Sequence, residues 1–125
     1  MDNKLGTMES QENTIQEKSL QFAVRIVKFC RYLRNDKHEY DLASQLLRCG
    51  TSIGANISES KNAQSRNDFI NKLNIALKES DETEYWLKVL YRSDVIDERS
   101  FISMQKDCVE IIRLLTSIIR TSKDV

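Results

Sequence analysis

The sequence predicts an all-α protein, folded as an antiparallel up-and-down bundle of four helices. Its 125 residues include no proline and three glycines, and 40% are hydrophobic while 30% are charged. That composition is typical of a soluble helical domain and excludes collagen-like, disordered and disulfide-rich chains. Hydrophobic residues recur at alternating spacings of three and four in four stretches, joined by short polar connections, and no stretch alternates with the period of a strand.

The first helix is expected over residues 14–35. Residues 1–13 are polar and carry no periodicity, so we expect a disordered N-terminal tail there. From residue 14 onward one apolar stripe continues without a break, as it does along a buried helix face. Its members are Ile15, Ser19, Phe22, Ile26, Phe29 and Leu33.

The second helix is expected over residues 40–58 and contains two glycines. Gly50 and Gly54 each cost roughly 1 kcal/mol relative to alanine inside a helix. Because they are four residues apart they share one face, so we expect another helix to pack closely against them. The stripe of this helix consists of Leu42, Leu46, Cys49, Ile53 and Asn56.

The third helix is expected over residues 66–91. Ser65 followed by Asp68 resembles a capping box with aspartate in place of glutamate. The middle of its stripe is small and polar. The stripe consists of Phe69, Leu73, Ala76, Ser80, Thr83, Leu87 and Leu90.

The fourth helix is expected over residues 98–121, with Asp97 as its N-cap. Residues 122–125 are expected to form a short C-terminal tail, so the bundle domain covers residues 14–121. The stripe consists of Phe101, Met104, Cys108, Ile111, Leu115 and Ile118.

The second, third and fourth helices carry apolar residues on more than one line. A wide core face would explain this pattern, and so would an interface between copies of the chain. The periodicity alone leaves both explanations open.

The residues that carry enzymatic or metal chemistry are scarce. His38 is the single histidine, and the cysteines Cys30, Cys49 and Cys108 lie too far apart in sequence for a zinc pattern. There is no glycine-rich phosphate loop and no Glu-x-x-His pair for a di-iron site. We therefore expect no catalytic residue, no metal and no cofactor. Because no signal peptide and no apolar run of membrane-spanning length is present, we expect a cytoplasmic protein.

Polar residues near the helix seams have structural explanations. Glu79 should lie level with the second helix, where Arg48 can reach it. Asn56 is expected to bond to a neighbouring helix and fix the register. Glu59 is expected to pair with Arg66 or to accept from the first N–H groups of the third helix.

Basic residues concentrate on the first helix and its exit, where they outnumber the acids Glu17 and Asp36. Aromatic residues lie among them. Such a face can contact phosphates, although a run of charge is more often a solvated surface, and the whole chain is neutral. The candidate nucleic-acid face consists of Lys18, Arg25, Lys28, Arg31, Arg34 and Lys37.

Two motifs resemble the 23S rRNA intervening-sequence protein family. The first is TSIGANISE over residues 51–59, and the second is FINKLNIALKE over residues 69–79, continued by ETEYWL over residues 82–87. Ser60 stands where many members carry glycine. The resemblance extends over about residues 19–115. The residues that match the family motifs, to which we assign structural roles, are Asn56, Glu59, Lys78, Glu79 and Glu82.

The resemblance implies a four-helix bundle that assembles as a ring-like homopentamer. It also implies a relation to the accessory protein of diversity-generating retroelements, which binds a reverse transcriptase and nucleic acid. We therefore expect a non-enzymatic, oligomeric scaffold or binding module for RNA or an RNA-associated protein, with no membrane and no small-molecule substrate as partner. A protein–protein adaptor without nucleic-acid contact is the alternative.

Overall fold

The computed structural model describes residues 3–124, with side chains from residue 10 onward, and this part of the chain contains four α-helices and no strand. The helices are α1 (Asn3–Asn35), α2 (Tyr40–Ser60), α3 (Arg66–Arg92) and α4 (Glu98–Asp124). The prediction of an all-α bundle is confirmed. No helix within residues 3–124 combines the length and the apolar character that crossing a membrane requires.

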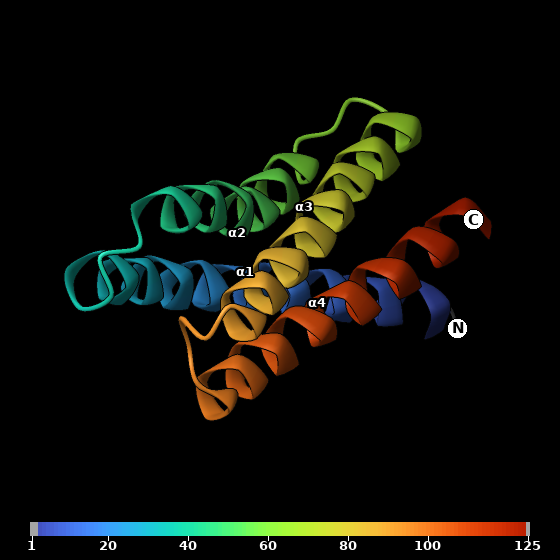
Figure 1. The fold of residues 1–125 in the computed structure, drawn as a ribbon. Coiled ribbons are helices and arrows are strands. Elements are labelled where there is room, and N and C mark those ends of the chain that lie inside the picture. The colour runs from blue at the N-terminus through green and yellow to red at the C-terminus, as the bar shows by residue number, and fades with distance from the viewer. Residues whose placement is uncertain (1–2, 125) are drawn as a thin grey trace.

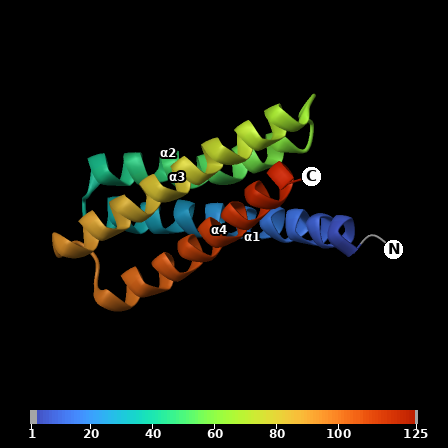
Figure 2. The same cartoon turned by 90° about the vertical axis from the view of Figure 1, so that its right-hand side faces the viewer.

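The helices run up and down in sequence order, and both ends of the chain lie at the same end of the bundle (Figures 1 and 2). Each helix packs against its neighbours in sequence, and α1 closes the bundle against α4. The α1–α4 contact is the least extensive of the four, and α4 crosses α1 obliquely in both views. Among the described residues, the helices that lie diagonally across the bundle, α1 with α3 and α2 with α4, do not come into close backbone contact.

A continuous apolar core runs along the bundle axis, built from the predicted stripes. Burying such side chains supplies most of the stability of a small helical domain, at about 1.5–3 kcal/mol for each large one. The largest fully buried side chains are Phe22, Ile15, Ile26, Leu33, Leu46, Ile53, Ile57, Leu73, Leu87, Leu90, Ile111 and Leu115.

The two glycines of α2 mark the closest approach of α1. A Cβ atom added at Gly50 would lie 2.8 Å from Cγ1 of Ile26, and one added at Gly54 would lie 3.3 Å from the carbonyl oxygen of Ser19. The expected close packing is therefore present, and its partner is α1.

Helices α3 and α4 begin at the predicted caps. The Asp68 N–H donates to Ser65 Oγ at 3.1 Å, and the Ser100 N–H donates to Asp97 Oδ1 at 2.7 Å. The latter bond holds the pKa of Asp97 below its ordinary value. Asp68 in turn accepts from the Gln64 N–H at 3.3 Å. In the usual capping box this second bond comes from the N–H of the N-cap residue itself, whereas here it comes from the residue before it.

Both expected tails are wrong where the structure describes them. Instead of a disordered segment over residues 1–13, α1 begins at Asn3, because the segment has no proline and the Gln11 amide donates to Ser117 Oγ of α4 at 3.4 Å. Residues 1 and 2 lie outside the described residues. The expected tail at 122–125 is helical through Asp124, since Ser122 still faces the core, and residue 125 lies outside the described part.

Candidate functional site

A polar cluster of Arg48, Glu79, Glu82 and Trp86 joins α2 to α3. The Arg48 guanidinium lies 3.5 Å from Glu79 and also forms an ion pair with Glu82. The Trp86 indole donates to the same Glu82 carboxylate at 3.3 Å. Because the Glu79 side chain is only 18% exposed, it needs this cation as compensation for lost hydration. The expected contact between Arg48 and Glu79 is present, and both carboxylates are engaged in holding the two helices together.

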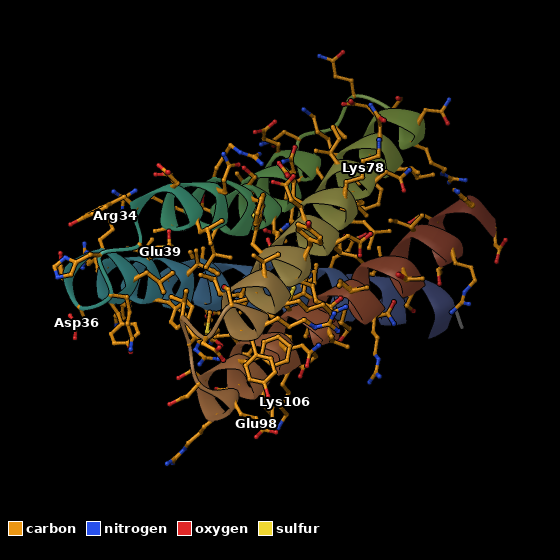
Figure 3. All side chains as sticks on the ribbon, viewed as in Figure 1. Arg34, Asp36, Glu39, Lys78, Glu98 and Lys106 are labelled. Carbon is orange, nitrogen blue, oxygen red and sulfur yellow. The ribbon has the colours of Figure 1, made fainter. Side chains whose placement is uncertain are left out.

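The remaining motif residues follow a different pattern from the one expected. Glu59 pairs with Lys72 at 2.9 Å instead of Arg66, since Lys72 lies on the side of α3 that faces α2. This bond raises the pKa of Lys72. The Asn56 amide donates to the Ser52 carbonyl of its own helix at 2.9 Å and not to a neighbouring helix. Lys78 is exposed on α3 (Figure 3).

The predicted nucleic-acid face does not form one surface of free cations. Lys18 pairs with Glu110, and Arg25 pairs with Asp107, so both side chains tie α1 to α4. Arg25 also donates to Ser103 Oγ at 2.9 Å.

The other four cations of that face lie toward the C-terminal end of α1. Arg34 donates to Ser44 Oγ of α2 at 2.8 Å, and Lys37 lies 5.9 Å from the ring centre of Tyr32. Lys28 and Arg31 are exposed and form no salt bridge within the described residues. Lys37 is also exposed and forms no salt bridge within the described residues, so these three cations of the candidate face remain available to a polyanion.

The cysteines are buried thiols. The Cys30 thiol donates to the Ala43 carbonyl at 3.4 Å, and the Cys108 thiol donates to the Ser80 carbonyl at 3.3 Å. Burial raises the pKa of Cys30 to about 11 and that of Cys108 to about 12, which keeps them protonated and poorly nucleophilic. No group of three or more histidine, cysteine, aspartate or glutamate side chains within the described residues is arranged to hold a metal ion.

A groove runs between α1 and α2 above the close approach of the two helices. It is a hollow of about 500 Å³ whose floor is formed by small residues, among them Ala23, Gly54 and Ala55. Leu20 borders it and is 59% exposed, and Val24, one turn further along α1, is 47% exposed. Additional apolar lines were predicted on the other three helices and not on α1. The four-residue spacing of Leu20 and Val24 is the signal in the sequence that indicates this pair.

A second group of exposed large side chains lies on the other half of the bundle. Ile75 and Tyr85 are on α3, and Ile102 is on α4. Tyr32 of α1 and Tyr40 of α2 are exposed as well. The molecule therefore presents one exposed apolar pair beside the α1–α2 groove and single exposed apolar side chains elsewhere, among them Ile75 and Tyr85 of α3.

Exposed cations also lie on α4, outside the candidate face predicted on α1. The signal that could have found them is their regular spacing of seven residues. They are Arg99, Lys106, Arg113 and Arg120.

The chain is similar to known proteins over most of its length. A family model described as 23S rRNA-intervening sequence protein matches residues 11–117. A crystal structure of a protein with unknown function from the S23 ribosomal protein family of Bacteroides thetaiotaomicron VPI-5482 is 54% identical. The similarity covers 88% of this chain and 98% of that one, with a TM-score of 0.87. No curated protein matches.

Proposed function

The chain belongs to the 23S rRNA-intervening sequence protein family, and we propose that it is a non-enzymatic scaffold that self-associates and binds RNA or an RNA-associated protein on its outer surface. The observation that carries the proposal is the exposed apolar pair Leu20 and Val24 beside the α1–α2 groove. A second copy of the chain would remove this apolar surface from water.

A ring-like assembly fits the positions of the exposed apolar side chains. The α1–α2 groove and the exposed Ile75 and Tyr85 of α3 are different surfaces. A contact between unlike surfaces is head-to-tail, and its repetition closes a ring when the rotation per copy divides a full turn, and otherwise builds an open filament, whereas a twofold dimer uses one surface twice. We propose a ring-like homopentamer on this ground together with the family resemblance.

A non-catalytic role is supported by the way the carboxylates are used. Glu79 and Glu82 are partly buried acids of the kind that serve as a general acid or base, and Arg48 engages both. Glu84, also partly buried, pairs with Lys88 and accepts from Gln105. A cytoplasmic location is supported by the three unpaired thiols, because disulfides are rare in reducing compartments.

Light scattering coupled to gel filtration at micromolar concentration tests the self-association. We expect the mass of five chains for the wild type and a lower mass for Leu20→Glu/Val24→Glu. Ile102→Glu, an exposed apolar residue on α4 and outside the groove, is the matched control and should leave the mass unchanged. A monomeric wild type would refute the scaffold.

RNA binding is tested separately by the mobility shift of a structured RNA at low and at moderate salt. A shift that weakens as salt rises is expected, because phosphate contacts release counterions. If there is no shift at low ionic strength, the second candidate holds, a protein–protein adaptor. The observation that favours this candidate is the pairing of Lys18 and Arg25 with acids of α4, which makes that side of the bundle mixed in charge.

A further inference from the structure

The outer side of α4 carries a row of four cations, which we call the α4 stripe. Its members are seven residues apart, about 20° short of two helical turns, so they lie on one side of the helix and drift by about 60° around it from the first to the last. Each successive pair is separated by about 10.5 Å along the axis and the whole line is about 31 Å long. All four side chains are exposed, and Figure 3 shows Lys106 in the first half of α4. The α4 stripe consists of Arg99, Lys106, Arg113 and Arg120.

The acids of α4 are directed away from this line. Between Arg99 and Arg120 the helix has two carboxylates, Asp107 and Glu110, and both form ion pairs with cations of α1. None of the four stripe cations takes part in a salt bridge within the described residues. The packing of α1 on α4 thus neutralises the two acids in the middle of α4 at the seam and leaves the stripe cations facing solvent. The other acids of the helix, Glu98 and Asp124, lie at its two ends.

The side chains along the stripe suit a polyanion better than a protein surface. Protein interfaces are centred on buried apolar or aromatic anchors, and Ile102 is the one exposed large hydrophobic residue of α4 in the described part of the chain. Three of the four cations are arginines, whose planar guanidinium groups bind phosphate oxygens through two parallel hydrogen bonds. Equal charges at regular intervals along a rigid rod match a regularly charged backbone.

We propose that the α4 stripe is a nucleic-acid site that binds the phosphate backbone of duplex RNA without reading its sequence. This inference rests on the proposed function, and it assigns the main phosphate contact to α4 instead of to the candidate face on α1.

Fluorescence anisotropy with a labelled 20-base-pair RNA duplex of mixed sequence, titrated between 50 and 200 mM KCl, tests the site. In Lys106→Gln/Arg113→Gln we expect the slope of log affinity against log salt to fall by about two, since each lost phosphate contact removes about one. Glutamine keeps the helix propensity of the original residues. Circular dichroism and light scattering should show an unchanged fold and an unchanged assembly.

Two matched variants give the comparison. Arg66→Gln/Lys78→Gln removes two exposed cations of α3 and should leave the slope unchanged. Lys28→Gln/Arg31→Gln removes two exposed cations of α1 and should lower the salt slope less than the α4 variant does.

Three results would overturn the inference. The first is that the α4 variant keeps the salt slope of the wild type while the α1 variant has a reduced one. In that case the protein still binds RNA, but the phosphate site lies on α1. The second is competition by polyglutamate as strong as that by unlabelled duplex, which would indicate an acidic protein partner. The third is the absence of RNA binding by the wild type, in which case the light-scattering result still decides the scaffold on its own.

Discussion

Of the two glycines of α2, Gly50 has less room for a side chain. A methyl group there would lie 2.8–2.9 Å from three side-chain carbons of Ile26, a branched residue with little rotamer freedom. Overpacking of this kind costs about 1–3 kcal/mol, more than the roughly 1 kcal/mol that alanine gains in helix propensity. We therefore expect Gly50→Ala to lower the free energy of unfolding in urea denaturation.

Gly54→Ala is the matched comparison, because its added Cβ would be at a milder 3.3 Å from Ser19 O. It should cost less than Gly50→Ala. In an Ile26→Ala background the cost of Gly50→Ala should shrink, which a double-mutant cycle measures. A more stable Gly50→Ala protein would contradict the close approach of α1 and α2.

The buried thiols give the protein a loss of stability at high pH. An unfolded cysteine ionises around pH 9.0, but Cys30 and Cys108 keep their protons until about 11 and 12 when the chain is folded. Above pH 9 the folded state therefore binds more protons than the unfolded state. The free energy of unfolding should fall by up to about 1.4 kcal/mol per pH unit for each thiol, and this contribution is fully present below pH 9.

Urea denaturation of the wild type and of Cys108→Ala at pH 8, 9 and 10 measures this effect. The variant is less stable overall, but its stability should decline less steeply with pH. Equal slopes for the two proteins would show that Cys108 does not contribute to the decline.

At the scale of single helices, the start of α3 is fixed by one serine. Ser65 Oγ accepts from the Asp68 N–H, one of the donors that a helix leaves unsatisfied at its first turn. We expect Ser65→Ala to destabilise the protein by about 1 kcal/mol in urea denaturation. Ser65→Asn, which keeps an acceptor at the cap, should be close to the wild type. If the two variants are equally unstable, the hydroxyl acts through something other than capping.

The helices also end without glycine. His38 follows α1 with a φ of 54°, and Asp94 follows α3 with a φ of 64°. Both adopt the left-handed conformation that usually favours glycine, and short polar side chains such as that of aspartate tolerate it best. The absence of glycine and proline at these points explains why the helix ends are less sharply marked in the sequence than the helix starts.

At the scale of the whole molecule, charge helps to close the bundle. The α1–α4 contact is the least extensive helix pair, and Arg25 with Asp107 and Lys18 with Glu110 bridge it. Because the side chains of both pairs are about 40% exposed, each contributes no more than about 0.5–1 kcal/mol. Arg25→Asp and Asp107→Arg should each lower the stability, and the double charge swap should recover most of the loss.

Chemical denaturation with urea at 0.05 and 1 M NaCl provides the measurement. High salt should reduce the difference between the single variants and the wild type, because half-exposed pairs are screened. If the double swap loses as much stability as the two single variants lose together, the pair does not couple the helices.

The same ion pairs decide which charges the surface offers to a partner. In a neutral chain, Lys18 and Arg25 pair with the acids of α4, while the α4 stripe and cations elsewhere, such as Lys28 and Arg31 of α1, form no salt bridge within the described residues. A bundle with no net charge can thus still present a row of unpaired cations.

The features that follow from local spacing could be predicted from the sequence. The four helices and the caps at Ser65 and Asp97 depend on residues within a few positions of one another. The contact between Arg48 and Glu79 was also predictable, because a short connection between antiparallel helices sets which residues lie level.

The tertiary structure decided what depends on contacts between distant segments. The pairing of Glu59 with Lys72 and the neutralisation of Arg25 by Asp107 both depend on how one helix is rotated against another. A helical period says which side of a helix is buried but not which neighbour its flanking charges meet. The sequence by itself therefore determined the bundle, and only the packing of its helices determined which charges remain free on the surface.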